Sequence, residues 1–225
     1  MRSERHVLVI FPHPDDEAFA AAGTIRAHVV AGTPVTYACL TLGEMGRNLG
    51  NPPVATRESL PHIRRKELQA ASKVMGISDV RMMGFRDKTL EFEPLEVLKN
   101  LVLQLVAELS PSLVISFYPG YAVHPDHDTT GRAVADALQE IPMSDRPTFH
   151  AVAFSNNHEA DIGKADVVHD VSRYADVKLN ALRAHASQLA WTLPDLESAY
   201  YAGVPEAVQR IAYERFWTFP FTEGD

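Results

Sequence analysis

Short apolar runs alternate along the chain with longer segments in which apolar residues recur every three or four positions. The runs lie at 6–11, 35–42, 80–84, 113–117, 149–154 and 167–171. Many of their residues are β-branched, and runs of this length are typical of strands that are buried on both faces of a parallel sheet. The segments between the runs predict helices at 16–31, 60–75, 94–109, 129–141 and 172–188.

The predicted helices have recognisable ends. Gly32 and Gly76 follow the first two, where glycine adopts the left-handed conformation that ends a helix, and Pro94 opens the third. No linker, repeat or low-complexity tract interrupts the alternation, so residues 1–225 are expected to form a single domain. Alternating strands and helices predict the α/β class, here a Rossmann-like three-layer αβα sandwich with a mostly parallel sheet.

Three segments do not fit this alternation. Residues 43–58 include three glycines and two prolines and follow the second strand, and a loop of this length in a compact domain is usually functional. Residues 156–166 are polar and predict a surface segment. The aromatic residues between 216 and 221 predict a packing segment or an oligomer contact, which leaves a homo-oligomer open.

Composition narrows the class of partner. The formal net charge of −8 argues against nucleic acid, because phosphate binding needs a basic surface. No apolar run approaches the ~18 residues of a transmembrane helix, so no membrane partner is expected. The single cysteine, Cys39, excludes an intramolecular disulfide and a zinc site built from several thiolates. Residues 1–5 lead directly into a strand rather than a secretory signal, and a cytoplasmic protein is expected.

Two clusters of histidine and carboxylate residues follow predicted strands. Residues 11–17 are Phe-Pro-His-Pro-Asp-Asp-Glu, and residues 124–128 are His-Pro-Asp-His-Asp. Adjacent carboxylates repel one another and are costly to desolvate, and a cation nearby would remove that cost. Because ligands of open α/β sheets bind outside the carboxyl ends of the strands, folding should bring the clusters together. The sequence therefore predicts a split metal site.

Residue type and spacing indicate which side chains bind the metal. His13 and Asp16 are three residues apart at a strand-to-helix turn, and His127 would be the third ligand. Two histidines and one carboxylate, with a position left open for water, are the pattern of catalytic zinc, although Fe²⁺ can occupy the same ligands. The alternative is structural: the carboxylates at 15–17 favour the start of a helix, and His127 is a surface histidine.

These motifs resemble a known family. Pro-His-Pro-Asp-Asp-Glu at 12–17 and His-Pro-Asp-His at 124–127 are similar to the motifs of the PIG-L/LmbE family of zinc-dependent N-acetylglucosaminyl deacetylases. Further agreement lies at 41–44, 63–68, 84–87 and 185–188, and the similarity extends from about residue 5 to 190. Segments 43–61 and 213–217 resemble, more narrowly, the deacetylases of bacillithiol biosynthesis.

The resemblance implies a role for each residue of the two clusters. In that family the first His and the second Asp of the first motif, with the last His of the second, bind zinc, which agrees with the ligands inferred above. The resemblance further makes Asp15 the general base. It gives His124 the role of stabilising the oxyanion, with Asp126 orienting His124 and keeping it charged.

The resemblance also implies a metal-dependent amidohydrolase whose substrate is a small N-acetylglucosamine conjugate, and the narrower branch implies N-acetylglucosaminyl malate. Malate has two carboxylates, so an acidic protein needs local cations to bind it. Arg47 in the long loop and Arg64 near the start of the second helix are the candidates, because arginine binds carboxylates in a bidentate manner. Alternatively, Arg64 pairs with Glu67 on its own helix and Arg47 is solvated.

Other functions remain open from the sequence. A phosphoesterase can use the same ligands, although the chain lacks extra ligands for a second metal. A deacetylase of another N-acetylglucosamine conjugate, including a lipid-linked one, would use the same chemistry. A zinc-dependent sugar-binding protein without turnover would need neither Asp15 nor His124.

Overall fold

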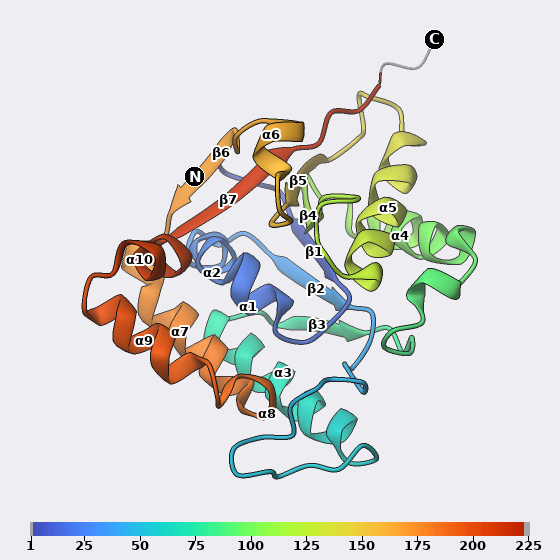
Figure 1. Ribbon diagram of the computed structural model, residues 1–225. Coiled ribbons are helices and arrows are strands. Elements are labelled where there is room, and N and C mark those ends of the chain that lie inside the picture. Colours follow the sequence, from blue (N-terminus) through green and yellow to red (C-terminus); the bar gives the residue numbers. More distant parts are fainter. Residues whose placement is uncertain (1, 223–225) are drawn as a thin grey trace.

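A seven-stranded sheet with the order β3-β2-β1-β4-β5-β7-β6 runs through the computed structural model, which describes residues 2–222 (Figure 1). The first five strands pair in parallel, and β7 pairs antiparallel with both β5 and β6. The strands are β1 Val7–Phe11, β2 Val35–Cys39, β3 Asp79–Met82, β4 Leu113–Phe117, β5 Thr148–Val152, β6 Val167–Asp170 and β7 Tyr213–Thr218. The mostly parallel sheet predicted from the sequence is confirmed.

Helices cover both faces of this sheet, which confirms the three-layer sandwich. The α-helices are α1 Asp16–Ala20, α2 Ala22–Val30, α3 Leu60–Met75, α4 Leu95–Leu109, α5 Pro125–Gln139, α6 His158–Ile162, α7 Ala175–Ala184, α8 Ala186–Leu189, α9 Leu193–Tyr201 and α10 Pro205–Ala212. Two 3₁₀ turns lie at Leu90–Phe92 and Ser172–Tyr174. Helices α4 and α5 lie on one face, and α2, α3 and α7 lie on the other (Figure 1).

The central strand β1 shows why its sequence is continuously apolar. Val7, Val9 and Phe11 pack into the core on the α2–α3–α7 face, and Leu8 and Ile10 pack into the core on the α4–α5 face. All five side chains have no solvent exposure. Burial of such a side chain stabilises the fold by about 1.5–3 kcal/mol, so this strand fixes the position of the residues that follow it.

Several boundaries differ from the predicted ones. The helix expected at 16–31 is interrupted at Ala21, where φ is −147° and the backbone leaves the helical region. The helix expected at 172–188 is divided into a 3₁₀ turn, α7 and α8, with His185 at the junction. The aromatic residues Phe216 and Trp217 are indeed packed, but they belong to β7, a strand that the sequence analysis did not predict.

The order of the strands creates a crevice at the carboxyl ends of the central strands. The chain moves from β1 outward to β2 and β3, and then returns to add β4 on the other side of β1. The loops after β1 and β4 therefore diverge at a topological switch point, which is where open α/β sheets bind ligands. Both predicted clusters lie here, because His13 follows β1 and His124 immediately precedes α5. Within residues 2–222, no helix is long and apolar enough to cross a membrane.

Candidate active site

Three of the predicted ligands converge on one point. His13 Nδ1 lies 3.1 Å from His127 Nε2, and the Asp16 carboxylate lies 3.5 Å from the first nitrogen and 3.4 Å from the second. His127 Nδ1 is 3.0 Å from the carbonyl oxygen of Ala122, which accepts its proton and leaves Nε2 with a free lone pair. Two imidazole nitrogens and a carboxylate in this arrangement fit a divalent metal with His₂Asp ligation.

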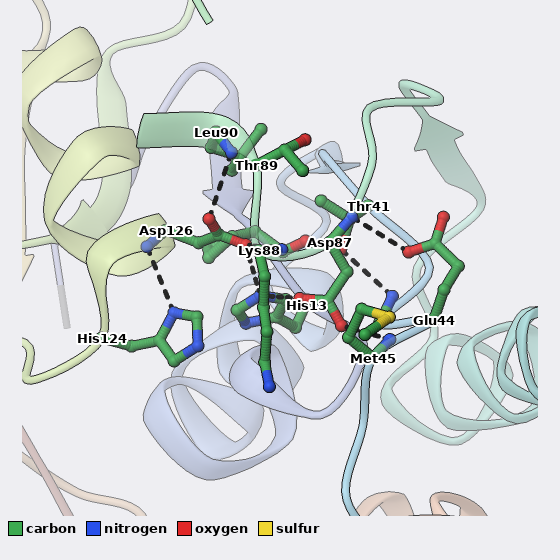
Figure 2. Close-up of polar contacts among 12 residues, drawn as sticks. His13, Thr41, Glu44, Met45, Asp87, Lys88, Thr89, Leu90, His124 and Asp126 are labelled. Carbon is green, nitrogen blue, oxygen red and sulfur yellow. Dashed lines mark hydrogen bonds and ion pairs between the residues drawn. The ribbon is translucent and has the colours of Figure 1, made fainter. Parts of the chain in front are cut away.

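The opposite nitrogen of His13 is held by two carboxylates (Figure 2). His13 Nε2 lies 3.1 Å from Asp126 Oδ2 and 3.1 Å from Asp87 Oδ1. Burial alone would lower the pKa of His13, but Asp126, Asp16 and Asp87 together raise it well above its usual range. A carboxylate behind a metal-binding histidine orients the ring and makes its other nitrogen a better ligand.

Asp87 is a site residue that the sequence analysis did not single out. Its carboxylate is 4% exposed and also accepts a hydrogen bond of 2.8 Å from the backbone N–H of Met45. The backbone N–H of Asp87 donates to the Glu44 side chain at 3.1 Å. The available signal was its place at the end of the 84–87 motif, directly after a strand. His13, Asp87 and Asp126 form a cluster tight enough to be compatible with a cation, as do His13, His124 and His127.

Asp126 makes different contacts from those expected. Its carboxylate accepts hydrogen bonds from the backbone N–H of Lys88 at 2.7 Å and of Leu90 at 3.2 Å, in addition to contacting His13. It is the backbone N–H of Asp126, not its carboxylate, that contacts His124, with a distance of 3.1 Å to Nδ1. The reason is that His124 is the N-cap of α5 and accepts from its first turn. Asp126 therefore orients the ring of His13 through its side chain.

The surroundings of His124 favour its neutral form, whereas the sequence analysis expects a charged ring. Burial lowers its pKa, and the neighbouring His13 and His127 lower it further, against a smaller opposing effect of Asp126. Because Nδ1 accepts the Asp126 N–H, the neutral ring has its proton on Nε2, the nitrogen that remains available as a donor. The ring lines the cavity, and its centroid lies 5.0 Å from that of His13 and 5.1 Å from that of His127.

The adjacent residues Asp15 and Asp16 have opposite electrostatic environments. Burial raises the pKa of Asp15 to about 6, although Arg64 opposes that shift. The pKa of Asp16 is lowered, because His127 and His13 outweigh the effect of burial. Two carboxylates whose pKa values are separated in this way are suited to different roles, one exchanging a proton and the other remaining a permanent anion.

Arg64 is placed beside Asp15 rather than along its own helix. Its guanidinium lies 3.0 Å from Asp15 Oδ2 and also donates to the backbone carbonyls of Pro14 and Gly43. Gly43 has a φ of +63°, and a Cβ there would lie 1.6 Å from Arg64 Nη1, so this close approach requires glycine. The pairing with Glu67 considered from the sequence is absent among the described residues, because Glu67 accepts from Ser187 instead.

A second layer supports Asp15 from behind. Asp15 has a φ of +93°, a left-handed conformation that is unfavourable for a residue with a side chain. Its backbone N–H donates to Glu17 at 3.1 Å, and the same carboxylate accepts from Tyr37 at 3.0 Å and from His185 at 2.7 Å. Glu17 and His185 have no solvent exposure. The sequence analysis noted His185 only as part of a motif, because its partner lies far away in the sequence.

The site opens into a cavity of about 810 Å³. Arg47 lines this cavity from the long loop after β2, as the sequence analysis expected, and its side chain is exposed. Apolar walls come from several elements, and they include Phe19, Met45, Phe117, Phe154, Leu196 and Trp217. The metal-binding candidates therefore line the same cavity as a set of large apolar side chains.

Comparison with protein families and sequences identifies related enzymes. The PIG-L family model, described as GlcNAc-PI de-N-acetylase, matches residues 8–138. A protein of Bacillus anthracis named probable N-acetyl-alpha-D-glucosaminyl L-malate deacetylase 2 is 59% identical and aligns over 99% of both chains. A protein of Bacillus subtilis with the same name is 47% identical, over 98% of this chain and 100% of its own.

Solved structures share the fold. The N,N'-diacetylchitobiose deacetylase of Pyrococcus horikoshii superposes with a TM-score of 0.73 at 25% identity, covering 96% of this chain and 84% of its own. The 4-carboxy-2-hydroxymuconate hydratase of Pseudomonas putida KT2440 superposes with a TM-score of 0.72 at 19% identity, covering 98% and 99%. Since a hydratase has the same fold, the reaction must be argued from the site rather than from the architecture.

Proposed function

Because the chain belongs to the PIG-L family of de-N-acetylases, we propose that it hydrolyses the N-acetyl amide of N-acetylglucosaminyl malate. The products are acetate and the free amine of glucosaminyl malate. Full-length relatives with 47–59% identity have names that specify this substrate. The observation that most directly supports the chemistry is the convergence of His13 Nδ1, Asp16 and His127 Nε2, in a cavity that Asp15 also lines.

His13, Asp16 and His127 would hold Zn²⁺ or Fe²⁺, in agreement with the donor set inferred from the sequence. When bound there, a divalent metal would lower the pKa of water toward ~7 and polarise the acetyl carbonyl. Asp126 and Asp87 hold the ring of His13, and the Ala122 carbonyl holds that of His127. These contacts fix both imidazoles before any cation binds.

Asp15 is the proposed general base. Its carboxylate accepts a proton from the attacking water, whose oxygen forms a bond to the acetyl carbon. The C–N bond then breaks, and Asp15 returns the proton to the departing amine nitrogen. Arg64 holds the Asp15 side chain and opposes the effect of burial on its pKa, so that the carboxylate is ionised at neutral pH.

His124 is the proposed donor to the oxyanion. With Nδ1 occupied by the Asp126 N–H, the Nε2–H of the neutral ring is the group that can donate toward the carbonyl oxygen. In this assignment the donor is a neutral imidazole, not the charged histidine expected from the sequence. The assignment predicts that the alkaline limb of a pH–rate profile does not report deprotonation of His124.

Arg47 is the arginine proposed to contact the malate group. The guanidinium of Arg64 is directed at Asp15 and two backbone carbonyls, whereas Arg47 is exposed in the cavity and makes no side-chain hydrogen bond or ion pair to the described residues. We therefore assign Arg64 to the general base and Arg47 to the substrate. Substitution of Arg47 by alanine should weaken the preference for the malate conjugate roughly tenfold, the scale of a charge-assisted hydrogen bond.

Acetate release measured on three substrates tests the proposal. N-acetylglucosaminyl malate, its methyl glycoside analogue and N,N'-diacetylchitobiose would be compared, with metal content measured on the same protein. We expect the highest kcat/KM on the malate conjugate. Equal kcat/KM on all three substrates would contradict the malate assignment, and no acetate release from any of them by metal-loaded protein would contradict the deacetylase itself.

A further inference from the structure

Lys88 occupies an unusual backbone position next to the metal-binding candidates. Its φ is +61°, in the left-handed region that disfavours residues with a side chain. The buried Asp126 carboxylate holds the turn, because it accepts from the N–H groups of both Lys88 and Leu90. A non-glycine residue kept in this conformation beside an active site is a candidate for a functional role.

The conformation of this turn directs the Lys88 side chain into the cavity. Figure 2 shows the side chain extending from the turn between His124 and Asp87, past the ring of His13. The side chain is exposed, and within residues 2–222 no ion pair shorter than 4.0 Å includes its ammonium group. Two other cations of the cavity are already paired, since Arg64 lies 3.0 Å from Asp15 and Lys178 lies 3.0 Å from Glu214.

The position of Lys88 is tied to the ring of His13. The preceding residue, Asp87, contacts His13 Nε2 through its carboxylate, and Asp126, which binds the Lys88 N–H, contacts the same nitrogen. In the proposed substrate the acetamido group and the malate are attached to adjacent ring carbons, C2 and C1. A carboxylate of the malate must therefore lie close to the reacting amide, in the part of the cavity that Lys88 and His13 both line.

We propose that the ammonium group of Lys88 binds a carboxylate of the malate and thereby determines the preference for an anionic aglycone. The inference rests on the proposed function and extends it to a residue outside the metal and base set. The surroundings need such a cation, because Asp15, Asp16, Asp87 and Asp126 line or underlie the site and would repel a dianion. Lys88 and Arg47 together would supply one cation for each carboxylate.

The test compares two substrates in matched variants. kcat/KM would be measured for N-acetylglucosaminyl malate and for the methyl glycoside of N-acetylglucosamine in the wild type, K88M, K88R and R86M. Methionine keeps most of the lysine stem without its charge. Arg86 is an exposed neighbouring cation that does not line the cavity, so R86M controls for a general loss of positive charge.

We expect K88M to lose at least tenfold in kcat/KM on the malate conjugate, mainly through KM, and less than twofold on the methyl glycoside. K88R should restore most of the loss, and R86M should resemble the wild type. The preference of the wild type should also shrink as salt is added. Calorimetric binding of glucosaminyl malate, the product, should weaken in K88M by a similar factor without any dependence on turnover.

Two outcomes would overturn the inference. An equal loss on both substrates would show that Lys88 acts on the shared chemistry or supports the loop, and an unchanged preference in K88M would show that another group binds the malate. These results differ from failure of the proposed function, which would appear as the absence of a malate preference in the wild type itself.

Discussion

Two groups of buried or half-buried histidines in this molecule have opposite electrostatic surroundings. In the active site (His13) and behind it (His185), burial would lower the pKa of the histidine, but neighbouring carboxylates raise the pKa of both residues above the usual value. Along α2 and the β5–β7–β6 side of the sheet, burial lowers the pKa of His28 to about 4 and also lowers those of His150 and His169. In the first region the surroundings favour a positive charge on or beside the imidazole. In the second region they favour the neutral imidazole.

The difference comes from the placement of carboxylates rather than from burial. The second region has one buried carboxylate, Glu214, which is directed at the backbone N–H groups of Gly23 and Thr24 and at the ammonium of Lys178. It caps the start of α2 and forms no hydrogen bond or ion pair with the histidines among the described residues. His150 instead stacks on Phe216, with ring centroids 5.7 Å apart. The burial of a histidine alone therefore says little about function, whereas the carboxylates that contact it do.

The largest expected effect is loss of the metal from the first region. His127→Ala and Asp16→Ala each remove one of three converging donors, so bound zinc should fall from about one per chain to a small fraction of that. His150→Ala, in the second region, should retain full metal content. The measurement is metal analysis after dialysis of each purified variant. Full occupancy in both active-site variants would show that the ligands are different residues.

The next effect separates the two adjacent aspartates. Asp15→Asn should keep its metal and lose a hundredfold or more in kcat, the scale of general acid–base catalysis. Burial raises the pKa of Asp15 to about 6 in the metal-free protein, and a bound cation lowers it. Asp15 must be ionised to accept a proton, so the kcat/KM of the metal-loaded wild type should have an acidic limb that lies below pH 6.

Steady-state kinetics and metal analysis on the same samples test this division of roles. Asp16→Asn is the matched variant, because it makes the same chemical change one residue later in the chain. We expect it to lose metal together with activity. If Asp15→Asn lost the metal while Asp16→Asn kept it, the assigned roles of the two carboxylates would be reversed.

That the two clusters meet could be predicted from the sequence, because both clusters immediately follow strands. An apolar run such as residues 7–11 specifies a buried strand, and parallel strands end at a common edge. The groups that support Asp15, directly or through Glu17, could not be predicted in this way. Arg64 and His185 reach the site from positions distant in the sequence, and nothing local in either segment specifies that approach.

Strand β7 could not be predicted from local patterns either. Its residues alternate between buried and exposed positions only in part, and its aromatic composition is equally compatible with a packed loop. Its pairing depends on β5 and β6, which lie far away along the chain. The fold class was predictable because local patterns repeat. The antiparallel edge was not, because it depends on tertiary contacts.

A smaller effect is expected from His28 in the second region. His28 is 2% exposed, and its Nε2 has no hydrogen-bond partner among the described residues. Its pKa is lowered in the folded state to about 4 from 6.5, so below pH 6.5 the unfolded chain takes up a proton that the folded chain does not. The contribution of His28 to stability is thus fully present above pH 6.5 and decreases as the pH falls toward 4.

Urea unfolding of metal-free protein at pH 7 and pH 5 measures this contribution. The wild type should lose about 2 kcal/mol more than His28→Leu between the two pH values, as the pKa difference requires. Leucine has a similar size and cannot be protonated, so it removes the titration with little change in packing. The same pH dependence in both proteins would show that His28 is freely protonated in the folded state.

The smallest expected effect concerns His185, which belongs to the first region but lies behind the reacting groups. His185 donates to Glu17, and Glu17 accepts the backbone N–H of Asp15, whose left-handed conformation depends on this support. His185→Ala should therefore misplace the general base and lower kcat roughly tenfold, since small errors in the position of a catalytic group are costly. KM and metal content should stay close to those of the wild type, because His185 touches neither substrate nor ligands.

His150→Ala is the matched control from the second region: it should lower the urea midpoint without changing kcat. If both variants lost stability and neither lost kcat, His185 would be a structural histidine like those of the second region.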